Sequence, residues 1–280
     1  MKIIIHGGFF SESDTSQEIK QAKQEALKTI VTKGFEYLKS QSSMNTVEYV
    51  VSLLEDDPLF NAGTGSQIQS DGIIRMSASI MDGDLQNMSG VINIENVRNP
   101  IKVARLLQHY EDRFLSSFGA NAFADKNSIP FYNPEIPQLR KEYELNIKNT
   151  RTSTVGCVCL DRENKIAVGT STGGKGFEIP GRVSDSCTIA GNYANSYCGV
   201  SLTGVGEDII NGGMAAKIVT RVSDGMSIEN AFIKSFKELK EINGYAGAIG
   251  IDYKGNIYHY ESHPTMVYAS FDGENFDVFN

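Results

Sequence analysis

The stretch NTRTSTVGCVCLD, residues 149–161, changes character in its middle. The residues before Thr154 are polar and turn-like, whereas from Val155 onward apolar residues crowd together as they do in a strand that is buried on both faces. Thr154 is therefore the first residue of a predicted core strand. It is either no more than the first residue of that strand or a residue placed there for chemistry.

The chain on either side of this stretch predicts blocks of strands and blocks of helices. Apolar alternation between turns predicts strands at 2–6, 72–80, 90–95, 154–161, 165–172, 201–204, 246–252, 256–261 and 265–271. Apolar spacings of three, four and seven predict helices at 14–41, 45–55, 99–110, 116–125, 207–223 and 227–241. Residues 126–153, with three prolines and a charged RKEYE run, predict a mobile segment. Because strands and helices are grouped rather than alternating, the pattern favours a layered α+β architecture.

Composition excludes several classes of partner. The 280 residues carry 34 acidic and 26 basic side chains, a net charge of -8, and contain no basic run. This argues against a nucleic-acid or anionic-membrane partner. The sequence has neither the apolar core of a signal peptide nor the roughly 20 consecutive apolar residues of a membrane span. The four cysteines show no zinc-ligand spacing, so we expect small buried core residues in a reduced, cytoplasmic protein.

The segment GTSTGGKG, residues 169–176, has the glycine and lysine spacing of a phosphate-binding P-loop. Two features argue against that function. Gly176 stands where a Ser or Thr should hold Mg²⁺, and Pro180 stands where the phosphate-binding helix should be running. We interpret the segment as a glycine-rich turn that follows a strand.

Six motifs, in order along the chain, carry a resemblance to a known family: LEDDPLFNAGTGS, SASIMDG, TVGCVCLD, TSTGG, GRVSDS and LTGVGE. Together they resemble the plant-type L-asparaginase and isoaspartyl peptidase family of N-terminal nucleophile hydrolases. The resemblance extends over nearly the whole chain. It implies one domain over residues 1–280, folded as a four-layer αββα sandwich, and a homodimer of αβ units.

The resemblance implies that the chain cuts itself between Ser153 and Thr154 into an α subunit, 1–153, and a β subunit, 154–280. The Thr154 hydroxyl would then be the nucleophile and its freed α-amino group the general base. An α-amino group titrates near pH 7.7–8.0, so a useful fraction is neutral at physiological pH and no histidine is required.

Other motif positions acquire roles from the same resemblance. Thr172, in TSTGG, would hydrogen-bond and support the nucleophile. Thr203 and Gly204, in LTG, would form the oxyanion hole with one hydroxyl and one backbone N–H. Asn61 would turn toward the nucleophile.

The resemblance also implies a substrate clamp. Arg182 would bind the α-carboxylate of the substrate, and Asp185 and the Gly206 carbonyl would bind its α-ammonium. Taken without the motifs, an arginine and an acid three residues apart would be more simply a surface ion pair, worth about 0–1 kcal/mol.

The LEDDPLFNAGTG loop resembles a sodium loop, since hard cations prefer oxygen ligands. The implied ligands are the main-chain carbonyls of Leu54, Glu55, Asp57, Phe60, Ala62 and Thr64. The ion would be structural, and no cofactor is expected for catalysis.

The implied activity is hydrolysis of L-asparagine and β-aspartyl (isoaspartyl) dipeptides. The alternative is an unprocessed, catalytically silent relative that binds an amino acid or a partner protein. Some positions depart from the family pattern. Phe9 and Phe10 follow HGG and Ser153 precedes the nucleophile, which predicts slow or incomplete self-cleavage, while Ser184 beside Asp185 predicts a changed substrate preference.

Overall fold

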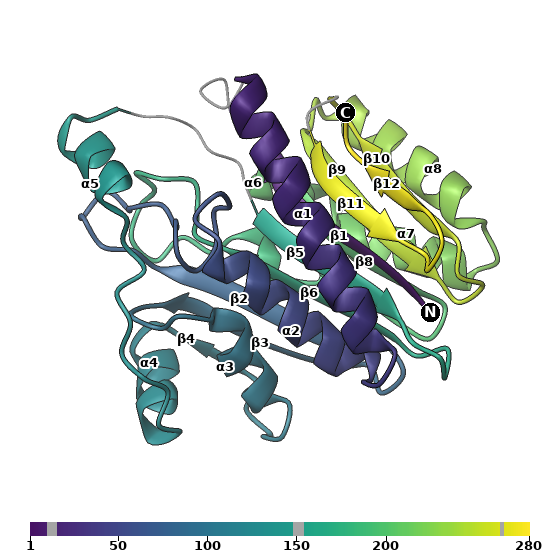
Figure 1. Cartoon of the computed structure of the whole chain (residues 1–280), viewed down its shortest axis with the longest axis horizontal. Coiled ribbons are helices and arrows are strands. Elements are labelled where there is room, and N and C mark those ends of the chain that lie inside the picture. Colours follow the sequence, from purple (N-terminus) through teal and green to yellow (C-terminus); the bar gives the residue numbers. More distant parts are fainter. Residues whose placement is uncertain (10–15, 148–153, 264–265) are drawn as a thin grey trace.

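The computed structural model describes residues 1–9, 16–147, 154–263 and 266–280. Two β-sheets lie face to face, and helices flank them (Figure 1). The predicted layered α+β architecture is therefore confirmed at this level.

The larger sheet has eight strands in the order β12-β11-β1-β5-β6-β2-β3-β4. Their bounds are β1 Lys2–Phe9, β2 Met76–Asp82, β3 Asn87–Ile94, β4 Phe114–Ser116, β5 Thr154–Leu160, β6 Ile166–Thr172, β11 Met266–Phe271 and β12 Phe276–Val278. All neighbours run antiparallel except β3 and β4. Every residue of β5 and β6 is buried, which agrees with the continuous apolar runs in the sequence.

The smaller sheet has four strands in the order β10-β9-β8-β7. Their bounds are β7 Asn192–Ala194, β8 Cys198–Gly204, β9 Ala246–Asp252 and β10 Ile257–Glu261. Strand β8 lies over β5 and β6 of the larger sheet. Gly199 allows this approach, since a Cβ there would lie 2.7 Å from Ile166 and 3.1 Å from Val158.

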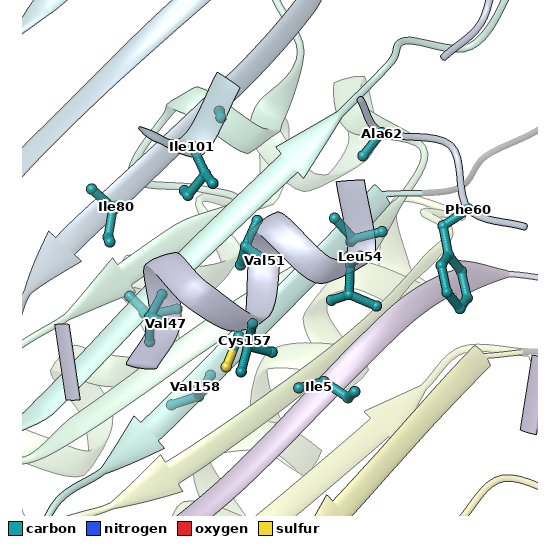
Figure 2. Packing of buried hydrophobic residues seen from close by; sticks show 14 of the residues in the cluster. Ile5, Val47, Val51, Leu54, Phe60, Ala62, Ile80, Ile101, Cys157 and Val158 are labelled. Atoms are coloured by element: carbon teal, nitrogen blue, oxygen red, sulfur yellow. The ribbon is translucent and has the colours of Figure 1, made fainter. Parts of the chain in front are cut away.

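Helices cover the outer face of each sheet. Helices α1 (Gln17–Leu38), α2 (Ser43–Asp56) and α3 (Pro100–Leu107) pack on the larger sheet, whereas α7 (Met214–Ser223) and α8 (Ile228–Glu241) pack on the smaller one (Figure 1). Figure 2 shows Val47, Val51 and Leu54 of α2 lying over the strand that carries Cys157. All four side chains are fully buried. This apolar face fixes β5 and β6, and hence the ends of those strands.

Serine caps begin three of the helices. The side chains of Ser16, Ser42 and Ser227 accept hydrogen bonds from backbone N–H groups three residues further on, at the starts of α1, α2 and α8.

Two helix predictions were wrong in detail. The predicted helix 207–223 is broken into α6 (Gly206–Gly212) and α7, because Gly213 adopts a left-handed conformation with φ 55°. Within the segment predicted to be mobile, residues 137–144 form helix α5 (Pro137–Glu144), in which Leu139 is buried. Helix α4 (Ser117–Lys126) was predicted correctly. A 3₁₀ turn at Asp185–Cys187 completes the helical elements of the described chain.

Candidate active site

Two threonines face each other at one end of the larger sheet. Thr154 begins β5 and Thr172 ends β6, and the two residues are directly opposite in the antiparallel register. Both are buried, and the Thr154 hydroxyl donates to Thr172 Oγ1 across 3.3 Å. Thr172 Oγ1 also accepts from the Gly174 N–H at 3.2 Å. The strand pairing therefore fixes the distance between the two hydroxyls.

Asn61 lies behind this pair, in the loop that follows α2. Its Nδ2 donates to the Gly174 carbonyl at 2.5 Å, and its Oδ1 accepts from the Gln67 N–H at 3.2 Å. Its own carbonyl accepts from the Gly173 N–H at 3.0 Å. Asn61 thus holds its loop against Gly173 and Gly174, the residues that follow Thr172. Its connection to Thr154 is indirect and runs through Thr172.

Strand β8 brings a third threonine to the same place. Gly199 faces Val158, and a Cβ at Gly156 would collide with the Ser201 hydroxyl, so the two strands run past each other in steps of two residues. If the same alternation is continued by one step, Thr203 comes opposite Thr154. Thr203 is fully buried, and no group in the described part of the chain hydrogen-bonds its hydroxyl.

Gly204 follows with φ 142°, and a Cβ there would lie 2.6 Å from the Tyr245 carbonyl, so only glycine fits. A buried hydroxyl without a partner costs about 1–3 kcal/mol, which a ligand that accepts from it would recover. The Thr203 hydroxyl is therefore a donor available to a bound oxygen.

The residues predicted to bind the substrate, Arg182, Asp185 and Gly206, lie close to one another near the end of strand β8. A Cβ on Gly206 would lie 2.8 Å from Asp185 Oδ1 and 2.9 Å from Arg182 Nη2. Asp185 is 3% exposed, and its Oδ2 has no partner among the described residues. Burial raises the Asp185 pKa to about 7, although the nearby Arg182 charge opposes the shift. The carboxylate lacks a counter-charge sufficient to offset its desolvation.

Glu207 is a site residue that the sequence reasoning missed. It binds Arg182 with two hydrogen bonds, from Nε at 2.8 Å and from Nη2 at 3.0 Å, and Lys175 Nζ lies 3.6 Å from its Oε1. The hydrogen bonds from Arg182 lower the Glu207 pKa to about 2. Its place at the end of the LTGVGE motif was the available signal.

His6 is a second missed residue. The ring is fully buried, with Nδ1 2.8 Å from the Thr154 carbonyl and Nε2 2.8 Å from Ser201 Oγ. No sequence signal could have found these contacts, because Ser201 lies 195 positions further along the chain.

The loop predicted to hold sodium is closed on itself. The Thr64 N–H donates to the Glu55 carbonyl at 2.7 Å, and the Phe60 N–H donates to the Asp57 carbonyl at 3.1 Å. Glu55 is fully buried, and burial raises its pKa to about 8. Across the described ranges, no cluster of three or more His, Cys, Asp or Glu side chains could hold a metal, so an ion here would rest on main-chain carbonyls.

The remaining sequence predictions have mixed outcomes. Ser153 and Phe10 lie outside the described residues. All four cysteines are buried and unpaired, as predicted. The chain after Lys175 forms turns rather than a helix, which excludes the P-loop interpretation. Within the residues that the structure describes, every helix is too short or too polar to cross a bilayer.

Comparison with known proteins gives one consistent result. The sequence profile of a family described as Asparaginase matches residues 1–145 and 135–279. An isoaspartyl peptidase/L-asparaginase of Synechocystis sp. is 45% identical over 97% of this chain and 88% of its own. One of Nostoc sp. is 44% identical over 98% of this chain and 92% of its own. A plant-type L-asparaginase of Pyrococcus furiosus is 35% identical over 95% of each chain.

Proposed function

The chain belongs to the asparaginase family, and from this membership and the site geometry we propose that it hydrolyses L-asparagine and β-aspartyl dipeptides. The observation that carries the proposal is the pair of opposed threonine hydroxyls, 3.3 Å apart. The Thr203 hydroxyl, which has no partner among the described residues, is proposed to act beside them. Both substrate types present the same β-carbonyl to a nucleophile and differ only in the amine that leaves.

One hydrolysis of the Ser153–Thr154 peptide bond precedes the reaction; it consumes a water and leaves a carboxylate on Ser153 and an α-amine on Thr154. Before the cut the Thr154 nitrogen is an amide without useful basicity, and after it the nitrogen is an α-amine that can take the hydroxyl proton. The Thr154 oxygen then attacks the β-carbonyl carbon. Thr172, already hydrogen-bonded to that hydroxyl, holds it in position.

Charge develops on the former carbonyl oxygen as the tetrahedral intermediate forms. The Thr203 hydroxyl and the backbone N–H of Gly204 are the donors proposed for it, and no described group competes for that hydroxyl. The α-amine returns its proton to the leaving ammonia or amine as the C–N bond breaks. Water then hydrolyses the Thr154 ester and releases aspartate.

Arg182 and Asp185 select substrates that carry a free α-carboxylate and α-ammonium. Glu207 accepts from Nε and Nη2 of Arg182, which leaves the Nη1 side of the guanidinium for the substrate carboxylate. The Oδ2 of Asp185, which has no partner among the described residues, is the acceptor proposed for the ammonium. Gly206 lies next to Oδ1 of the same carboxylate and is proposed to add its carbonyl. The substrate thus brings the positive charge that the buried carboxylate lacks.

The proposal also covers the fold type, a structural ion, the location and the assembly of the enzyme. The two facing sheets with helices outside fit the four-layer αββα sandwich of N-terminal nucleophile hydrolases. The loop at 54–64 would hold a structural sodium ion on its main-chain carbonyls, of which those of Leu54, Glu55 and Asp57 each also accept a backbone hydrogen bond. We place the enzyme in the cytoplasm as a homodimer of αβ units.

Mass spectrometry combined with an assay of aspartate release tests the proposal. The active protein should consist of fragments of 153 and 127 residues, the second from 280 − 153. Thr154→Ala should stay one inactive chain, while Thr220→Ala, a change at an exposed threonine on α7, should behave as wild type. An active sample that holds only intact chain, or a β subunit beginning elsewhere, would overturn the mechanism. An intact, inactive wild type would favour the silent relative.

A further inference from the structure

Three polar side chains outside the proposed chemistry form a chain of hydrogen bonds that ends on the nucleophile residue. Thr170 Oγ1 lies 2.7 Å from Ser201 Oγ, and Ser201 Oγ lies 2.8 Å from His6 Nε2. His6 Nδ1 lies 2.8 Å from the carbonyl oxygen of Thr154. His6, Thr170 and Ser201 are all fully buried. Buried networks of this kind persist when every member has a partner.

The direction of each hydrogen bond in this network follows from the group at its end, the carbonyl oxygen of Thr154. The carbonyl oxygen of Thr154 can only accept, so Nδ1 of His6 must carry a proton. Burial lowers the His6 pKa to about 3, so the ring is neutral and Nε2 is an acceptor. Ser201 therefore donates to Nε2, and its own oxygen accepts from the Thr170 hydroxyl. One arrangement of protons satisfies the whole chain.

Strand pairing leaves a gap that this chain of bonds fills. The register between β1 and β5 ends at the pair His6–Gly156, two residues short of Thr154. Among the described residues, Thr154 thus has no strand partner on the β1 side. The imidazole supplies a donor to the Thr154 carbonyl in place of the missing ladder bond.

Gly156 makes room for the arrangement. His6, Gly156 and Thr170 are direct neighbours across β1, β5 and β6, and all face the smaller sheet. A Cβ on Gly156 would collide with both Ser201 Oγ and His6 Nε2. Its φ is not in the left-handed region, so the reason for glycine here is space rather than backbone conformation.

We propose that His6, held as its Nδ1–H tautomer by Ser201 and Thr170, is the positioning residue that fixes the main chain of Thr154 for attack. The catalytic consequence of this inference rests on the proposed function. His6 takes no part in proton transfer. The ring touches neither substrate nor the reacting hydroxyl. It acts by holding the backbone on which that hydroxyl is carried.

Two substitutions at one position separate the two ends of the imidazole. The amide nitrogen of asparagine falls near the place of Nδ1, so His6→Asn keeps the bond to Thr154 and loses the one to Ser201. The amide of glutamine reaches the place of Nε2, so His6→Gln keeps Ser201 and loses Thr154. Both variants leave Arg182 and Asp185 unchanged.

The kinetic test compares kcat and KM per cleaved subunit, counted by mass spectrometry. His6→Gln should lower kcat by about ten- to a hundred-fold with KM unchanged, the scale expected when a reacting group is misplaced by about 1 Å. His6→Asn should recover most of that loss. Gly156→Ala, which removes no polar group, should resemble His6→Gln. Equal losses in the two His6 variants, or a change in KM alone, would overturn the proposal.

A spectroscopic test does not depend on the activity. The nitrogen–proton correlation spectrum of histidine-labelled wild type should contain one signal that is absent from His6→Asn. The proton of that signal should lie on Nδ1, and the signal should not titrate between pH 5 and 9. A proton on Nε2, or titration near pH 6.5, would refute the assignment even if kcat falls. Were the wild type to hydrolyse none of the substrates, the proposed function would fail, and this spectrum would still decide whether His6 donates to Thr154.

Discussion

Replacing Asp185 with asparagine should stabilise the folded protein while weakening substrate binding. The carboxylate is 3% exposed, its Oδ2 has no partner among the described residues, and burial raises its pKa from 3.8 to about 7. An asparagine of the same shape carries no charge to desolvate. The nearest charged groups are Arg182, which lowers the pKa of Asp185, and Glu207, which raises it.

The magnitude follows from the two pKa values. Between pH 3.8 and about 7 the folded protein holds a proton that the unfolded chain has lost, so the free energy of unfolding falls as the pH rises through this window. The window spans about three pH units at about 1.4 kcal/mol each, or about 4 kcal/mol in all. Asp185→Asn should therefore be more stable than wild type by about 4 kcal/mol at pH 8 and by only about 1 kcal/mol at pH 4.5.

Urea unfolding measures this difference, with both proteins carrying Thr154→Ala so that each is a single uncut chain. Subtracting the two stability curves removes the titration of every other group. A gain that is the same at pH 4.5 and pH 8, or a variant less stable at pH 8, would refute the argument. In the cleavable protein Asp185→Asn should raise KM, because the charge-assisted bond to the substrate ammonium is worth about 1.5–3 kcal/mol.

Other variants test the remaining parts of the site. Thr203→Val should lower kcat by about 10²–10³-fold and leave unfolding stability unchanged or raised by about 1 kcal/mol, because the buried hydroxyl that it removes has no partner among the described residues. A loss of stability without a loss of kcat would show that the hydroxyl is structural. Arg182→Ala should raise KM for β-aspartyl dipeptides by about a hundred-fold and leave self-cleavage intact, since the scissile peptide offers no carboxylate to the clamp; an unchanged KM would reject the clamp. Glu207→Gln should raise KM by a smaller factor, about ten-fold, because Arg182 stays but loses its charged partner, and steady-state kinetics that show no change would mean that Glu207 does not orient Arg182.

Long periodic elements were predictable from sequence, and short or polar ones were not. Strands β5 and β6 and helix α8 stand almost where the apolar pattern placed them. Strands β4, β7 and β12 have three residues each, too few for any alternation to show. Helix α5 was missed because only Leu139 is buried, so its RKEYE run carries almost no apolar signal.

The site residues also fall into those that the sequence motifs identify and those that they miss. Thr154, Thr172, Thr203 and Arg182 stand within motifs, so resemblance alone could single them out, although their roles stay predictions. Two neighbours in space escaped. Glu207, in the first turn of α6, pairs with Arg182, 25 positions earlier and on the far side of strands β7 and β8 in the sequence. The contacts of His6 depend on three strands and a second sheet, which no local pattern encodes.

The order of strands in the larger sheet has a consequence for the proposed cut. Strands β1 to β4 precede Ser153 and strands β5, β6, β11 and β12 follow it, yet the order β12-β11-β1-β5-β6-β2-β3-β4 interleaves them. Three seams, β11–β1, β1–β5 and β6–β2, would therefore join the two fragments through backbone hydrogen bonds.

The smaller sheet lies wholly within the second fragment, but neither fragment holds the complete larger sheet, so each would need the other in order to form it. In the uncut chain the connection between them keeps their effective concentration high while these distant strands find one another. Cutting that connection afterwards would leave the native sheet intact but turn any later refolding into a bimolecular encounter. The mature enzyme would then persist through slow unfolding rather than through reversible equilibrium, and each molecule would have a single opportunity to assemble.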